Sequence, residues 1–133
     1  MFDSAQGIAA AAGAVVSALT AANAIYDHIV SLDLDDKEKR NLWTPRYVAE
    51  IFNTQPGYNV LLIYTKHRVD LRDVIYQGQV PFRLSTGFTI NYMLYIFDSG
   101  TVDLEGDGGY LNWTFQGNFK RSGGHVEFYS LLR

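Results

Sequence analysis

The pattern of apolar and polar residues divides the chain into two unlike parts. Residues 4–26 carry no charged side chain and are rich in alanine. On a helical wheel, the apolar side chains of this region fall on one stripe and the polar side chains fall on the other side. The stripe consists of Ile8, Ala12, Val15, Leu19, Ala22, Tyr26 and Ile29. This pattern predicts an amphipathic N-terminal α-helix, with Ser4 as its N-cap.

Small residues recur four positions apart along this helix, as at Ala14, Ala18 and Ala22. Such spacing lets the backbones of two helices approach closely. Two interpretations stay open: a helix that packs on the rest of the chain or in an oligomer, and a helix that inserts into a membrane. Alanine favours lipid only weakly, so insertion is expected only on assembly. The predicted insertion or oligomer-contact residues are Ile8, Ala11, Val15, Ala18, Leu19, Ala22 and Tyr26.

A run of charged residues follows from Leu32 to Asn41. Such runs are usually solvated linkers or the last turn of a helix. We therefore predict two parts. Residues 1–36 form the amphipathic helix and an acidic linker, and residues 37–133 form a β-sandwich domain.

From Leu42 onward the pattern favours short β-strands rich in Tyr, Phe, Val and Ile, separated by turns. The expected strands cover residues 47–52, 58–64, 73–77, 88–97, 101–105, 110–116 and 119–129, the last with a turn at Gly123–Gly124. Pro81 marks an edge strand or a strand start. Residues 101–105 and 110–116 are expected to pair as a hairpin. The prediction is a mainly β protein, an antiparallel β-sandwich of seven or eight short strands behind the N-terminal amphipathic α-helix.

Charge and composition narrow the function classes. The formal net charge is −3, and residues 1–36 contain five Asp but no Lys or Arg. The remainder is only weakly basic, which argues against a nucleic-acid partner. There is no cysteine, so neither a disulfide nor a Cys-based metal site can form. The N-terminus lacks the basic start of a signal peptide, so both the cytosol and secretion without a recognisable signal stay open.

No catalytic motif is present, and the three histidines stand in no recognisable pattern. We therefore expect no enzymatic activity and no cofactor. The segment Asp103-Leu-Glu-Gly-Asp-Gly108 resembles the opening of a calcium loop, with carboxylates at positions 1, 3 and 5 and glycine at 6. Thr114 stands where such a loop needs a bidentate Glu. The segment is therefore interpreted as an acidic hairpin turn, and no metal site is predicted.

Tyrosine and tryptophan combine an aromatic body with a polar tip, which suits glycan faces and membrane interfaces. They also fill the cores of sandwiches. The candidates for a lipid- or glycan-binding cluster are Tyr92, Tyr110 and Trp113.

The order of these parts resembles the sea-anemone actinoporins and, more broadly, the cytolysin and lectin β-sandwich group that includes the fungal fruit-body lectins. The features that carry the resemblance are the Gly/Ala-rich segment Gly7–Leu34, the pair Trp43-Thr44, the stretch Pro56–Tyr64, the aromatic Tyr110-Leu-Asn-Trp113 and a last strand near the C-terminus. The resemblance implies docking by the sandwich and insertion of the N-terminal helix into a multi-helix pore.

The sequence thus leads us to expect a membrane-active, oligomerising, pore-forming protein of the toxin or cytolysin type, with lipid-headgroup or glycan recognition on the sandwich. The alternative is a soluble lectin-like or self-assembling structural protein whose N-terminal helix is an oligomer seam. Membrane lipid or glycan and further copies of the chain are the expected partners.

Overall fold

The computed structural model describes residues 5–106 and 111–131, and side chains from Gly13 onward. Two helices, α1 (Ala5–Val30) and α2 (Asp36–Thr54), precede the strands. The strands are β1 (Asn59–Ile63), β2 (His67–Arg83), β3 (Thr89–Leu104), β4 (Trp113–Gln116), β5 (Phe119–Ser122) and β6 (His125–Phe128). The protein is mainly β, and the expected antiparallel pairing is confirmed.

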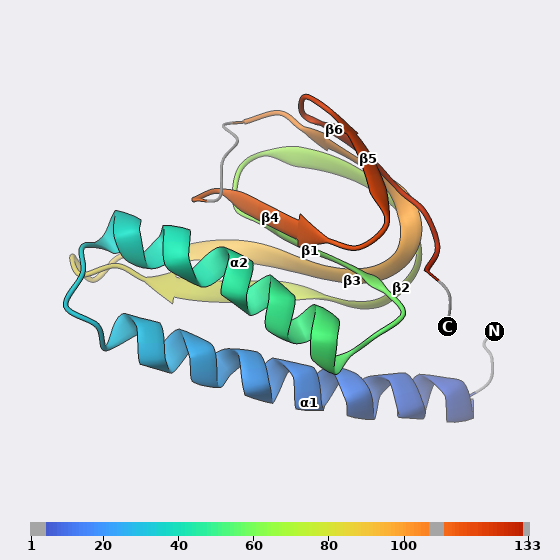
Figure 1. The fold of residues 1–133 in the computed structure, drawn as a ribbon, viewed down its shortest axis with the longest axis horizontal. Helices are drawn as coiled ribbons and strands as arrows, with labels where there is room; N and C mark the ends of the chain where they lie inside the picture. The colour runs from blue at the N-terminus through green and yellow to red at the C-terminus, as the bar shows by residue number, and fades with distance from the viewer. Residues whose placement is uncertain (1–4, 107–110, 132–133) are drawn as a thin grey trace.

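The strands belong to one curled sheet, with the order β4-β1-β3-β6-β5 and with β2 along the free side of β3 (Figure 1). The first half of β3 pairs with β1 and its second half with β6, while β2 follows β3 throughout. The finer prediction of a two-sheet sandwich with seven or eight strands is therefore not confirmed for the described residues. The curl of a single sheet encloses the space that a second sheet would otherwise cover.

The predicted hairpin between residues 101–105 and 110–116 is wrong. Residues 100–103 of β3 pair with β6, and β4 pairs with β1. The sequence between β3 and β4 resembles a hairpin turn, but the curl brings both strands other partners. The turn at Gly123–Gly124 is confirmed, since it joins β5 to β6.

Helix α2 occupies the region predicted as a linker followed by a strand at residues 47–52. Asp35 caps it, because its carboxylate accepts a hydrogen bond of 2.8 Å from the backbone N–H of Glu38. Trp43, Tyr47 and Ile51 recur at helical spacing and are buried. The apolar pattern around Tyr47 is thus one face of a helix, and residues 36–41 of the charged run form its first turns.

Both faces of the sheet are covered, which explains why every residue of β1 is buried. Val60 and Leu62 face the helices, whereas Leu61 and Ile63 face the inside of the curl. The core on the helix side is built around Trp43, whose ring contacts the rings of Tyr26, Tyr47, Phe82 and Tyr92. The core inside the curl contains Leu61, Ile63, Tyr95, Phe97, Val102, Trp113, Val126 and Phe128.

Helix α1 lies beside α2 and contributes to the helix-side core (Figure 1). Val15, Ala18, Ala22 and Ile29 are buried there. The division of the chain at residues 36 and 37 stays a prediction, but core contacts cross it. Within the described residues, neither helix has the length and apolarity needed to cross a membrane.

The sheet bends where β2 and β3 are irregular. Pairing slips between Val74 and Tyr76, and Asp73 has a positive φ of 52°. Such a bulge strengthens twist and redirects side chains. On β3, Tyr95 and Phe97 point into the curl before the bend and Val102 does so after it. Simple alternation from Phe97 would place Thr101 inside the curl. Because Val102 points inward instead, the inward positions have shifted by one residue and Thr101 points outward.

Candidate functional site

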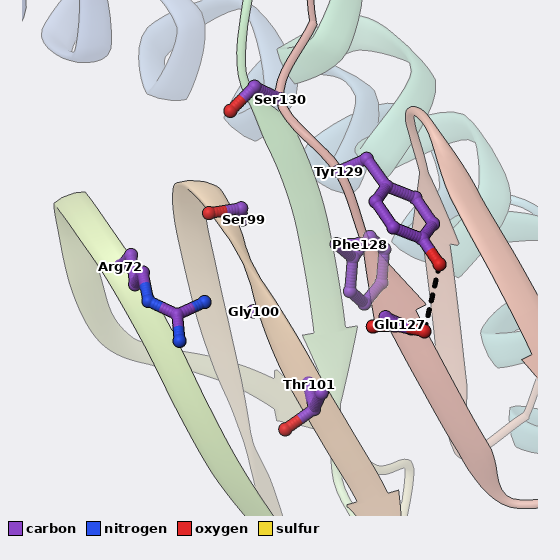
Figure 2. Close-up of a pocket in the computed structure, with 8 residues that line it drawn as sticks. All are labelled: Arg72, Ser99, Gly100, Thr101, Glu127, Phe128, Tyr129 and Ser130. Atoms are coloured by element: carbon purple, nitrogen blue, oxygen red, sulfur yellow. Dashed lines mark hydrogen bonds between the residues drawn. The ribbon is translucent and has the colours of Figure 1, made fainter.

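An open pocket of about 340 Å³ lies at this bend, across β2, β3 and the end of β6 (Figure 2). We call it the polar trough. Its lining residues are Arg72, Ser99, Gly100, Thr101, Glu127, Phe128, Tyr129 and Ser130.

Strand register brings these residues together from three segments. Arg72 lies opposite Ser99, and Thr101 lies opposite Glu127. Directly opposite residues of antiparallel strands project on the same face of the sheet. Because Val102 and its partner Val126 point into the curl, Thr101 and Glu127 point outward.

Gly100 forms the part of the trough floor between Arg72 and Glu127. Its φ of 134° is rarely adopted by residues with a side chain. A Cβ added here would collide with the backbone carbonyl oxygen of Asp70. Glycine therefore permits both the close approach of β2 and an open floor.

The trough presents one cation and one anion on opposite sides. Arg72 is exposed and forms no ion pair with the residues that the structure describes. Glu127 accepts a hydrogen bond of 2.8 Å from the hydroxyl of Tyr129 (Figure 2). That hydrogen bond raises the pKa of Tyr129, which keeps its hydroxyl protonated as a donor.

A buried asparagine holds the C-terminal side of the trough in place. The side-chain amide of Asn59 donates to the backbone carbonyls of Asp98, at 2.7 Å, and Tyr129, at 3.0 Å. Its carbonyl accepts from the backbone N–H of Asn118 at 2.8 Å. Next to it, the Ser130 hydroxyl donates to the Asp98 carboxylate at 2.6 Å. The segment after β6 is thus fixed to β1 and β3.

The residues predicted for insertion or oligomer contact do not lie in the trough. Val15, Ala18 and Ala22 are buried in the helix-side core, and Leu19 and Tyr26 are half-buried. The side chains of Ile8 and Ala11 lie outside the described part.

The predicted lipid- or glycan-binding residues also lie elsewhere. Tyr92 and Trp113 are buried in opposite cores, and Tyr110 is outside the described residues. Tyr92 donates a hydrogen bond of 2.6 Å to the carbonyl of Leu111 and accepts one of 2.9 Å from Arg40. Burial raises its pKa, and Arg40 partly offsets that effect.

Two of the carboxylates in the calcium-like segment have other partners. Asp103 contacts Nδ1 of His125 at 2.6 Å, and Glu105 pairs with Arg68 at 2.7 Å. Asp107 and Gly108 lie outside the described residues. Across residues 5–106 and 111–131, no three metal-ligating side chains gather into a group.

Sequence reasoning missed Arg72, Glu127 and Tyr129. The available signal was weak: isolated charged residues within strands that also carry inward-facing apolar residues. Their proximity depends on the bulge in β2 and on pairing between distant segments, neither of which local periodicity reveals.

The chain is similar to the stress response protein YvgO of Bacillus subtilis (strain 168), with 31% identity over 110 residues. The matched region covers 81% of this chain and 63% of that protein, so the chain spans less than two thirds of its relative. No family model and no solved structure matches the chain.

This relative corrects the predicted function. A protein named for a stress response points away from a pore-forming cytolysin. The burial of Val15, Ala18 and Ala22 gives a physical reason for the error, since the small apolar stripe of α1 is used for packing within the chain. The resemblance to actinoporins and fruit-body lectins stays an untested prediction.

Proposed function

We propose that this chain is a stress-response protein that acts by binding a ligand in the polar trough and not by catalysis. The observation that carries the proposal is the 31% identity over 110 residues to a stress response protein. The trough supports the binding part, because it offers a cation that forms no ion pair with the described residues, an anion and hydroxyl groups around Gly100.

The placement of the described histidines supports a non-catalytic role. The Nδ1 of His67 is 2.7 Å from the carbonyl of Thr65, and its Nε2 is 3.0 Å from the hydroxyl of Tyr95. His125 contacts Asp103. None of the three described histidines, His28, His67 and His125, lines the trough, so its Ser99 and Thr101 hydroxyls have no imidazole base there of the kind that activates a nucleophile.

The mixed charge of the trough also supports a partner other than nucleic acid. Arg72 is accompanied by Glu127 on the other side and by Asp70 two residues earlier on the same strand. Nucleic-acid binding depends on several cations that contact phosphates. Carboxylates beside a cation would repel those phosphates.

The test is the behaviour of the protein in its native organism. We expect its amount to rise several-fold after salt, ethanol, heat or oxidant treatment, measured by quantitative immunoblotting. Deletion of the gene should lower survival under the inducing treatment, and the wild-type gene should restore it. Constant protein levels and unchanged survival under all four treatments would contradict the proposal.

A further inference from the structure

Resting on the proposed binding function, we infer that the ligand of the polar trough is a small zwitterion whose charges are separated by several ångströms. Its anionic end pairs with Arg72 and its cationic end with Glu127. The ligand class follows from three features of the trough: its cation, its anion and the distance between them.

The cationic side is suited to a carboxylate. The guanidinium of Arg72 is exposed and forms no ion pair with a described residue. Its planar set of N–H donors matches the two oxygens of a carboxylate. The hydroxyls of Ser99 and Thr101 line the same pocket and can donate to such a group.

The anionic side is suited to an ammonium group. Glu127 receives one hydrogen bond from Tyr129, at Oε1. A carboxylate can accept about four hydrogen bonds, so capacity remains for further donors. Lys120 lies opposite Glu127 in register, but the two form no ion pair.

The charges disfavour a ligand with a single sign. An anion at Arg72 would share the pocket with Glu127 and would also lie near Asp70, two residues earlier on the same strand. A cation at Glu127 would lie near Arg72. Like charges repel. A ligand that carries both signs is attracted at each end of the trough and avoids repulsion from the like charge at the other end.

Strand spacing sets the distance between the two ends. Arg72 on β2 and Glu127 on β6 are separated by β3, which places their backbones roughly 10 Å apart. Their side chains form no ion pair with each other, so a ligand that contacts both has to span this distance. A pocket of about 340 Å³ lies at the lower end of the range for small-molecule sites. An ω-amino acid has the required form.

The test uses the full chain and three probes of matched length: 6-aminohexanoate, hexanoate and hexylamine. Isothermal titration calorimetry at neutral pH and low salt should show 6-aminohexanoate binding roughly tenfold tighter than either singly charged probe, the effect of one additional charge-assisted hydrogen-bonded pair. Arg72→Gln and Glu127→Gln should each remove that advantage. Arg83→Gln, at the C-terminal end of the same strand and also exposed, is the matched control and should bind like wild type.

Three outcomes would overturn the inference: equal binding of 6-aminohexanoate and hexanoate, no binding of any probe, or binding that Arg72→Gln leaves unchanged. Circular dichroism confirms that the variants are folded. None of these outcomes decides the stress experiment, which depends on protein levels and survival. The ligand class and the proposed function can therefore fail separately.

Discussion

Burial in the core changes the pKa values of three tyrosines. Burial raises the pKa of Tyr47, Tyr92 and Tyr95 above the ordinary value near 10, because the charged phenolate loses its hydration. The hydroxyl of Tyr47 contacts the side chain of Asn23 at 3.3 Å, which ties α2 to α1. The folded state therefore holds these three tyrosines in their protonated, neutral form.

The raised pKa values predict loss of stability in alkali. In the unfolded chain these tyrosines ionise near pH 10, whereas in the folded chain they remain protonated to higher pH. Their contribution is complete below about pH 10 and is lost as pH rises toward the folded-state pKa values. Tyrosinate absorbance and circular dichroism, followed together, should show these tyrosines ionising only as the fold is lost. Ionisation of all tyrosines near pH 10 with the fold intact would contradict this account.

Asn59 joins three segments that are distant in sequence, with partners 39, 59 and 70 residues away. We expect Asn59→Ala to lower the free energy of unfolding by about 3 kcal/mol, because it removes three buried or partly buried hydrogen bonds to the backbone. Asn91→Ala, at an exposed position in β3, is the control and should change it by less than about 0.5 kcal/mol. Urea unfolding measures both. Equal effects would mean that the Asn59 hydrogen bonds contribute little.

At the scale of elements, the sequence predicted strands better than it predicted the region before them. The expected strand at residues 58–64 corresponds to β1 (Asn59–Ile63). Pro81 lies in β2, which pairs among the described strands with β3 only. The short strand expected at residues 73–77 is part of a strand of 17 residues. Its charged residues and bulge interrupt the apolar alternation, so local periodicity could not reveal its length.

The buried and exposed faces of α1 should respond differently to the same substitution. Ala18 is fully buried in the helix-side core, whereas Ala24 is exposed on the same helix. Ala18→Leu should lower the free energy of unfolding by about 1–3 kcal/mol through overpacking. Ala24→Leu adds the same atoms toward solvent and should change it by less than about 0.5 kcal/mol. Urea unfolding measures both free energies. An equal loss of stability in the two variants would contradict the observed orientation of α1.

At the scale of the whole molecule, the curl of one sheet creates both the inner core and the trough. The bend coincides with the bulge at Val74/Tyr76 and with Gly100, whose missing side chain permits the close approach of β2. Antiparallel β structure was predictable from local patterns. The trough was not, because it depends on which strands pair and on a shift in which side chains point inward.

We propose that the polar trough performs the protein's role under stress, and replacement of the native gene by genes that encode two arginine variants tests this proposal. Arg72 lies in the trough, and Arg83 lies outside it on the same strand. Survival under an inducing stress should fall to the level of the deletion strain with Arg72→Gln and stay at the wild-type level with Arg83→Gln, at equal amounts of protein. Equal survival of the two variants would contradict the claim.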